Sequence, residues 1–205
     1  KLGAKARRAT STLYRRPHRP RLVRLANRVL GSLTSRKVVS VSLSESSLIR
    51  AAEERTGLLD LGDPSFREPM RMLLRSIEEE ARLHPLGRFI TRTRLVSTLE
   101  TRMRLEEMWR KNPEIERERV PRAIVILGLP RTGTTLLHRL LASDARVRSL
   151  ASWEALLPVP LEGEGETERR IAAARRSERA LEYLAPDFFA VHPIDALAPE
   201  EDVLL

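Results

Sequence analysis

The chain has 205 residues, and its 37 Lys and Arg exceed its 28 Asp and Glu, which gives a formal net charge of +9. The excess lies in residues 1–50, which carry 13 basic residues and one acid, Glu45, whereas residues 51–205 carry a net charge of −3. The basicity therefore belongs to a terminal arm, and the near-neutral body argues against a protein whose whole surface binds nucleic acid.

Several chemistries are excluded by composition. Because the chain has no cysteine, it has no disulfide framework, no thiolate nucleophile and no Cys-based metal site. Its four histidines include no pair at i, i+4, which argues against a zinc site. No apolar stretch approaches the roughly 18 residues that a membrane helix needs. We therefore expect a soluble, cytoplasmic protein that binds no metal.

Residues 1–42 form the basic arm. Within it, apolar residues recur at helical spacing among arginines, at Leu22, Leu25, Val29 and Leu33. Amphipathic helices usually serve a core, which favours docking of this stripe on the chain's own domain. Contact with an anionic membrane surface and an arginine-rich transit peptide are the alternatives.

Residues 43–120 form a segment with three predicted helices. The first begins near Ser44 and ends at Gly57, a residue typical of helix C-termini. The second begins with Asp63 as N-cap and a proline as its first residue. The third runs from Pro85 to about Arg110. No catalytic motif lies in this segment, and we expect it to pack, to contact a second subunit or to shape a pocket.

The pattern changes at residues 123–127, Ala-Ile-Val-Ile-Leu, a run typical of a central strand that is buried on both faces. A glycine-containing loop follows at residues 128–135, and leucines at helical spacing come next. The order of strand, glycine loop and helix is the one that an anion-binding loop needs. The predicted fold class is α/β, with a P-loop NTPase-like parallel sheet and flanking helices after a helical N-terminal segment.

Four further elements are expected towards the end of the chain. Residues 147–150 are predicted to form a second strand, and residues 167–184 an amphipathic helix. Residues 188–195 are expected to be extended or looped. A last helix is predicted to begin at Pro199, because acids in its first turn complement the helix dipole.

The loop nearly satisfies the pattern G-x-x-x-x-G-K-[ST], but Thr134 replaces the lysine. Glycines let the backbone turn and approach an anion closely, and Arg131 supplies the positive charge that the loop lacks at Thr134. A sulfuryl group carries less charge than a γ-phosphoryl group, so one arginine and backbone donors suffice without a metal. The pattern alone leaves sulfate and phosphate donors open.

Residues 128–141, Gly-Leu-Pro-Arg-Thr-Gly-Thr-Thr-Leu-Leu-His-Arg-Leu-Leu, resemble the 5'-phosphosulfate loop of sulfotransferases that use 3'-phosphoadenosine 5'-phosphosulfate (PAPS). The resemblance is closest to the bacterial branch and to protein-tyrosine sulfotransferases; the cytosolic branch has Lys in place of Arg131. Weaker similarity extends over most of residues 45–205, including Trp153, Glu154 and the segment from His192 to Asp195.

The resemblance implies the following roles. The donor PAPS is held by Gly128, Pro130, Arg131, Thr132, Gly133, Thr134, Thr135 and Leu136, without a metal. Arg131 stabilises the charge that builds on the bridging oxygen as PAP leaves. Glu154 is the first candidate for the general base and His192 the second. The alternative is that Glu154 is a surface or helix-cap residue and His192 a structural one.

By the same resemblance, residues 121–205 are expected to be the N-terminal part of a sulfotransferase domain, because the motifs for the 3'-phosphate and the adenine are not in the sequence. Expected acceptors are hydroxyls of small molecules, glycans or lipids, and no nucleic acid is expected. The arm offers a membrane contact. The other functions left open are an ATP-dependent P-loop phosphotransferase and a non-enzymatic module that binds anions through the arm.

Overall fold

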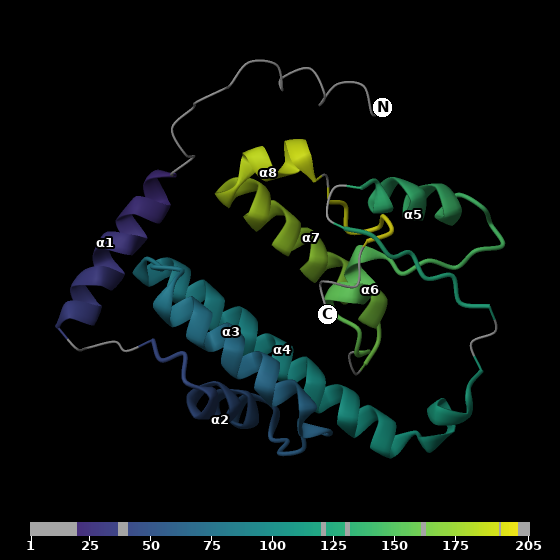
Figure 1. The fold of residues 1–205 in the computed structure, drawn as a ribbon, viewed down its shortest axis with the longest axis horizontal. Coiled ribbons are helices and arrows are strands. Elements are labelled where there is room, and N and C mark those ends of the chain that lie inside the picture. The colour runs from purple at the N-terminus through teal and green to yellow at the C-terminus, as the bar shows by residue number, and fades with distance from the viewer. Residues whose placement is uncertain are drawn as a thin grey trace.

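The computed structural model describes residues 20–36, 41–119, 122–129, 132–160, 163–192 and 194–200. The bounds of the helices are α1 Arg21–Ser35, α2 Glu45–Thr56, η2 Pro64–Phe66, α3 Arg67–Glu79, α4 Pro85–Lys111, η3 Pro113–Arg117, α5 Thr134–Ala142, α6 Ser152–Leu156, α7 Glu166–Leu184 and α8 Pro186–Val191. Among the described residues the helices other than α5 form two groups (Figure 1), one from α1 to η3 and one from α6 to α8, and no helix of one group packs on a helix of the other. No described helix is long and apolar enough to cross a bilayer.

The predicted α/β fold class, with its P-loop NTPase-like parallel sheet, is wrong for the described residues, which contain no sheet. Residues 123–129 form neither helix nor strand, and residues 147–150 end in one antiparallel bridge between Ala151 and Pro199. A strand is stable only when neighbouring strands pair with it and cover its faces. No described segment does this for residues 123–129, so Leu127 remains 88% exposed.

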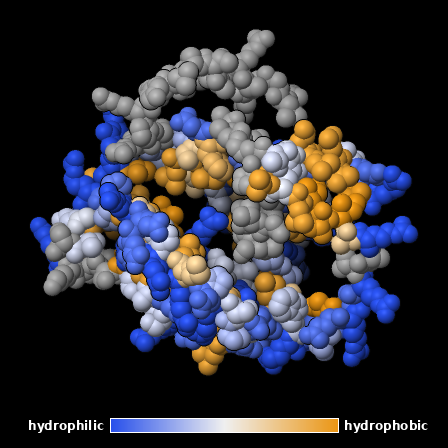
Figure 2. Space-filling model, viewed as in Figure 1, coloured by the Kyte–Doolittle hydropathy of each residue, from blue (hydrophilic) through white to orange (hydrophobic). Residues whose placement is uncertain are grey.

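An apolar patch results on this side of the molecule. The patch consists of side chains from residues 123–129 and from α5. Helix α5 packs on no other described helix. Figure 2 shows the hydrophobic surface over α5. The exposed apolar side chains of this patch are Ile124, Val125, Leu127, Leu129, Leu136, Leu137 and Leu140.

The helices predicted in residues 43–120 are confirmed, and local chemistry explains their ends. Ser44 caps α2 by accepting a hydrogen bond from the N–H of Ser47 (3.4 Å). Gly57 ends α2 with φ 71°, a left-handed conformation that glycine adopts without a Cβ clash. Asp63 accepts from the N–H of Ser65 (2.7 Å), but the turn that it caps is the 3₁₀ helix η2, and α3 follows directly.

The hydrophobic core lies between α2, α3 and α4. Leu48 and Ala52 of α2 and Met103 of α4 are completely buried. Thr56 donates its hydroxyl to the carbonyl of Ala52 (2.8 Å), and this hydroxyl lies 3.5 Å from the sulfur of Met103. The core therefore fastens α2 to α4. Its buried members are Leu43, Leu48, Ala52, Leu61, Leu74, Val96, Leu99 and Met103.

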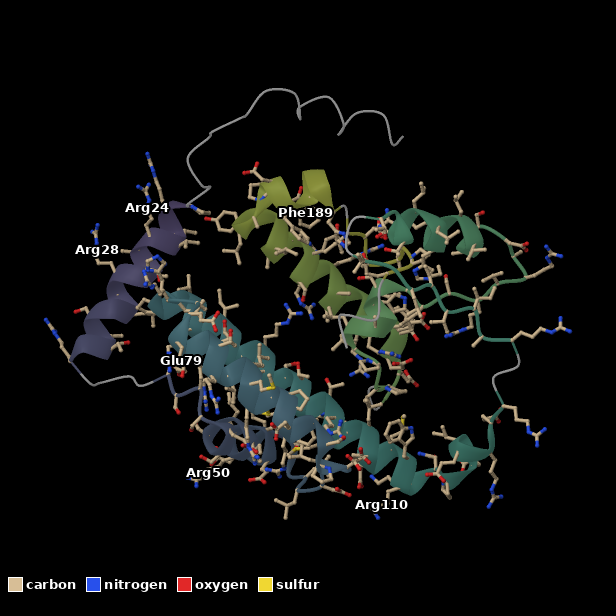
Figure 3. All side chains as sticks on the ribbon, viewed as in Figure 1. Arg24, Arg28, Arg50, Glu79, Arg110 and Phe189 are labelled. Carbon is tan, nitrogen blue, oxygen red and sulfur yellow. The ribbon has the colours of Figure 1, made fainter. Side chains whose placement is uncertain are left out.

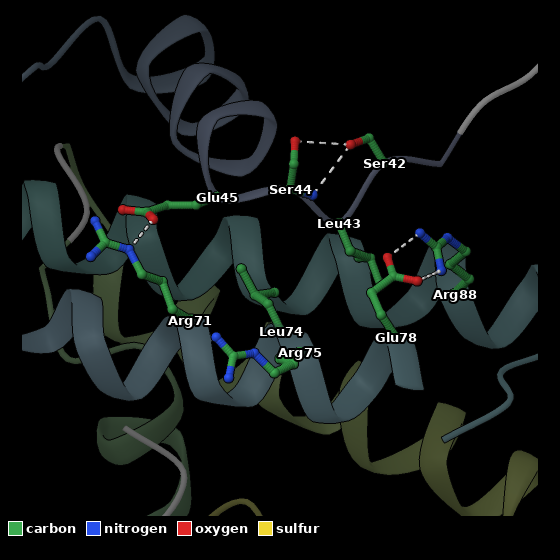
Figure 4. A pocket seen from close by; sticks show the side chains of 9 residues that line it. All are labelled: Ser42, Leu43, Ser44, Glu45, Arg71, Leu74, Arg75, Glu78 and Arg88. Carbon is green, nitrogen blue, oxygen red and sulfur yellow. Dashed lines mark hydrogen bonds and ion pairs between the residues drawn. The ribbon is translucent and has the colours of Figure 1, made fainter. Parts of the chain in front are cut away.

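Two ion-pair groups hold the start of α2 and the segment before it against α3 and α4. Glu45 binds Arg71 (2.7 Å) and Arg67 (2.8 Å), and Glu78 binds Arg88, which also donates to the carbonyl of Val41 (2.6 Å). Figure 4 shows the pairs Glu45–Arg71 and Glu78–Arg88 beside an open hollow. The volume of this hollow is about 400 Å³. The hydrogen bond from Arg71, with that from Arg67, lowers the pKa of Glu45. The hydrogen bond from Arg88 lowers the pKa of Glu78.

These lowered pKa values predict that acid destabilises the helical segment. A carboxylate whose pKa is lower in the folded state stabilises the fold above its unfolded pKa, and this stabilisation is lost as the pH falls through the folded pKa. We expect Glu45→Gln to lower the free energy of unfolding by about 0.5–1 kcal/mol at pH 7, since both arginines are partly exposed. At pH 2 the loss should be near zero. Urea denaturation at the two pH values measures the difference.

Glu118→Gln is the matched control, because Glu118 is exposed and no described cation pairs with it. It should change the unfolding free energy by less than 0.5 kcal/mol at either pH, as is usual for surface substitutions. An equal loss for Glu45→Gln at both pH values would contradict the role of the ion pair.

Candidate functional site

The candidate site begins at Gly128, where the backbone lies close to two threonines of the loop. A Cβ at this position would lie 2.7 Å from Cγ2 of Thr134 and 2.8 Å from Oγ1 of Thr132. Thr132 closes the turn by donating its hydroxyl to the carbonyl of Leu129 (2.7 Å). Both contacts are shorter than a real Cβ allows, so the loop in this conformation requires glycine at residue 128.

Gly133 makes the second turn and is the N-cap of α5. Its φ of 91° is a left-handed conformation that side chains disfavour, and its carbonyl accepts the N–H of Leu137 (3.0 Å). No side chain caps this helix end. A helix N-terminus carries a partial positive charge and binds anions when no side chain occupies it. The loop and α5 together therefore have the geometry of an anion-binding turn.

The structure brings together six of the residues predicted for donor binding. Gly128 and Thr132 lie in the loop, Gly133 caps α5, and its first turn holds the other three, Thr134, Thr135 and Leu136. Thr134 and Thr135 are half-buried, whereas the side chain of Leu136 is 65% exposed. Pro130 and Arg131 lie outside the described residues. The helix after the loop was correctly predicted, and the strand before it was not.

Glu154, the first candidate base, lies in the short helix α6. One of its carboxylate oxygens accepts the N–H of Ala151 (2.9 Å), and the other binds Arg148 (2.8 Å). The first contact caps the start of α6, and the second is an ion pair whose arginine is 80% exposed. Glu154 would have to exchange these contacts to accept a proton from an acceptor. Arg148 is a neighbour that sequence reasoning missed, because no motif marks it.

The ring of Trp153, the residue before Glu154, makes a cation–π contact with the buried side chain of Arg170. The guanidinium carbon of Arg170, from α7, lies 4.5 Å from the centre of the Trp153 ring. Arg170 also donates to the carbonyl of Leu157 (2.8 Å) and binds Glu166 (3.2 Å). These contacts fasten α6 to α7, which lie side by side in Figure 1. Trp153 therefore helps to fix the orientation of the helix that carries Glu154.

His192, the second candidate base, ends α8. The prediction of extended or looped chain at residues 188–195 was wrong for residues 188–191, because Pro186 starts a short helix at the position that favours proline. The Nε2 atom of His192 lies 3.4 Å from Oε1 of Glu200, a carboxylate that is almost completely buried. The His192 ring also lies 5.5 Å from that of Phe188. Glu200 is therefore a site neighbour that sequence reasoning had treated as a helix cap.

The helix predicted to begin at Pro199 is not seen at residues 199 and 200. Pro199 takes part in the bridge with Ala151, and Glu200 donates its N–H to the carbonyl of Leu150 (3.2 Å). The remainder of that predicted helix lies outside the described residues. No three His, Asp or Glu side chains gather as metal ligands within the described part of the chain.

The turn at Gly128 and Gly133 leads into the N-terminus of α5, which no side chain caps. This arrangement is typical of one class of site, which binds anions. The sequence match is more specific, since residues 121–205, which contain the loop and both candidate bases, match the sulfotransferase family. The similarity to this family covers the C-terminal part of the chain. Among curated proteins, none matches the chain.

Two crystal structures of mycobacterial sulfotransferases are similar to about four fifths of the chain. Sulfotransferase STF1 from Mycobacterium tuberculosis H37Rv is 28% identical, with a TM-score of 0.59 over 79% of this chain and 46% of that one. Sulfotransferase STF9 from Mycobacterium avium is 27% identical, with a TM-score of 0.61 over 80% of this chain and 43% of that one. The chain therefore spans less than half the length of these relatives.

Proposed function

We propose that the protein transfers a sulfuryl group from PAPS to an acceptor hydroxyl or amine. The observation that carries the proposal is the match of residues 121–205 to the sulfotransferase family, within which the loop has the geometry of an anion-binding turn. The proposal assigns the 5'-phosphosulfate end of PAPS to residues 128–136.

The residues of the loop fit such a donor. The missing side chain at Gly128 lets the side chains of Thr132 and Thr134 lie close to the backbone, and the N-terminus of α5 offers its partial positive charge. The hydroxyls of Thr134 and Thr135 supply further donors at the start of the helix. A phosphate oxygen binds such donors through charge-assisted hydrogen bonds, which are about twice as strong as neutral ones.

The reaction is an in-line displacement at sulfur. The acceptor oxygen or nitrogen forms a bond to the sulfur as the bond from sulfur to the bridging oxygen breaks, and PAP leaves with that electron pair. Arg131 would stabilise the negative charge that develops on the bridging oxygen, since a guanidinium binds such oxygens without losing its proton. The acceptor's proton would pass to a nearby base.

Glu154 remains the first candidate for that base and His192 the second. Support for Glu154 comes from its ion pair with Arg148, whose exposed side chain can move away without disturbing a core. Support for His192 comes from its contact with Glu200: the Nε2 atom of His192 lies 3.4 Å from Oε1 of this buried carboxylate, which fixes the position of the ring. The lack of the P-loop lysine at Thr134 argues against ATP as the donor.

The test is binding of the product PAP, measured by isothermal titration calorimetry. We expect PAP to bind, and we expect the double variant Thr134→Val and Thr135→Val to bind it at least about tenfold more weakly, because each valine removes a hydrogen bond to a charged group. Thr98→Val is the matched control, since Thr98 lies in α4 and its hydroxyl donates only to the carbonyl of Arg94 among the described contacts. Binding of Mg-ATP with no binding of PAP would contradict the proposal.

A further inference from the structure

Helix α1 packs on α4 with one side only. The amide of Asn27 accepts the N–H of Leu86 (3.0 Å). A Cβ at Gly31 would lie 3.8 Å from Pro85, so the two helices meet closely at this point. The predicted stripe of α1 was Leu22, Leu25, Val29 and Leu33. Its docking is wrong for Leu22, Leu25 and Val29, which are exposed, whereas Leu33 is half-buried.

The three apolar side chains at the start of this stripe are exposed to solvent. Leu22, Leu25 and Val29 are 66%, 55% and 49% exposed. Their spacing of three and four residues places them in one row along the helix. No described element covers this row. Three large apolar side chains in a row on a helix of 15 residues are costly to leave in water.

A row of arginines runs beside the apolar row. Arg21, Arg24 and Arg28 have the same spacing and are exposed, and no described carboxylate binds them. In Figure 3, Arg24 and Arg28 extend from α1 away from α4. The first turn of α1 has no acid. The sequence of residues 1–44 contains 12 basic residues and no acidic one.

We propose that the outer face of α1, formed by these two rows, binds the surface of an anionic lipid bilayer. Arginines bind lipid phosphates at the depth where the neighbouring leucines reach the acyl chains, so one surface satisfies both rows. A nucleic acid would neutralise the arginines but leave the leucines in water. A second copy of the helix would cover the leucines but bring the two arginine rows together, and like charges repel.

The proposal goes beyond sulfuryl transfer, because α1 belongs to the helix group that does not contain the donor loop. Binding through α1 would hold the protein at a membrane in the plane of the headgroups, with α4 on the solvent side. Contacts of the donor loop need not change. The proposal therefore stands or falls independently of the proposed activity.

The test is co-sedimentation of the full chain with vesicles of phosphatidylcholine and phosphatidylserine at 3:1, compared with vesicles of phosphatidylcholine alone. We expect binding to the anionic vesicles and at least tenfold weaker binding to the neutral ones. The triple variant Leu22→Ser, Leu25→Ser and Val29→Ser should lower the partition coefficient by about 100-fold, because three apolar side chains no longer insert. Replacing Arg21, Arg24 and Arg28 by Gln should also lower it by about 100-fold.

Each variant has a matched control. Leu59, Met72 and Leu73 are exposed to a similar extent but lie outside α1, so their replacement by Ser should leave binding within twofold. Arg104→Gln, Arg117→Gln and Arg119→Gln remove the same charge from exposed positions elsewhere. Circular dichroism should be unchanged in all four variants, since every replaced side chain is exposed.

Three results would overturn the proposal. Loss of binding in the arginine variant but not in the leucine variant would mean that α1 attracts any polyanion. Binding of a 20-base-pair DNA duplex without binding of anionic vesicles would assign the face to nucleic acid. Dimerisation in analytical ultracentrifugation that the leucine variant abolishes, with no vesicle binding, would assign it to a second copy of the chain.

Discussion

Replacing Arg131 by Ala is expected to lower the rate of sulfuryl transfer from PAPS by about 100- to 1,000-fold, the effect of removing one preorganised donor from a developing negative charge. The affinity for PAP should fall by less than tenfold, because the loop and the start of α5 still bind the 5'-phosphate. Single-turnover kinetics with PAPS, together with calorimetry of PAP, separate the two effects.

Arg119→Ala is the control for this prediction, since it removes the same charge from an exposed residue shortly before the loop. It should leave the rate within twofold. Arg131→Lys should retain at least a tenth of the rate, because a lysine also places a positive charge there. If Arg131→Ala weakened PAP binding and transfer by the same large factor, Arg131 would serve donor binding and not the transition state.

Replacing Leu48 by Ala is expected to lower the free energy of unfolding of the helical segment by about 2–5 kcal/mol. Leu48 is completely buried between α2 and α4, and its truncation leaves a cavity that Met103, also completely buried, cannot fill without leaving its own contacts. Urea denaturation followed by circular dichroism at 222 nm measures the change.

Leu59→Ala is the matched control, because Leu59 lies just after α2 but is 78% exposed. Its effect should be within about 0.5 kcal/mol. A loss below 1 kcal/mol for Leu48→Ala would mean that α2 does not unfold together with α4. The core described here would then not be the cooperative unit of this part of the chain.

Local chemistry explains why the helices of residues 43–120 were predictable. Ser44 and Gly57 act on neighbouring backbone groups, so their effect is visible in a few residues of sequence. The strand at residues 123–127 depends instead on partners from distant segments, and no described segment supplies them. An apolar, β-branched run indicates what would be buried in a sheet, but it does not provide the sheet.

The same distinction applies to the candidate site. The glycines of the loop were predictable, because a close approach at Gly128 and a positive φ at Gly133 restrict the residue type directly. The partner of Glu154, Arg148, and the partner of His192, Glu200, were not selected from the sequence. Arg148 lies six residues before Glu154 and Glu200 eight residues after His192, and neither separation is one at which a helix brings side chains together.

The apolar patch around α5 has a consequence for handling the protein in the cell and in the test tube. Surfaces of this kind are recognised by chaperones and favour aggregation while they stay uncovered. The half of the molecule that carries α5 is therefore the half that limits solubility, whereas the helices around Met103 have a core of their own. Expression yield should respond to substitutions at Leu127 and Leu140 far more than to changes on the outer faces of α3 and α4.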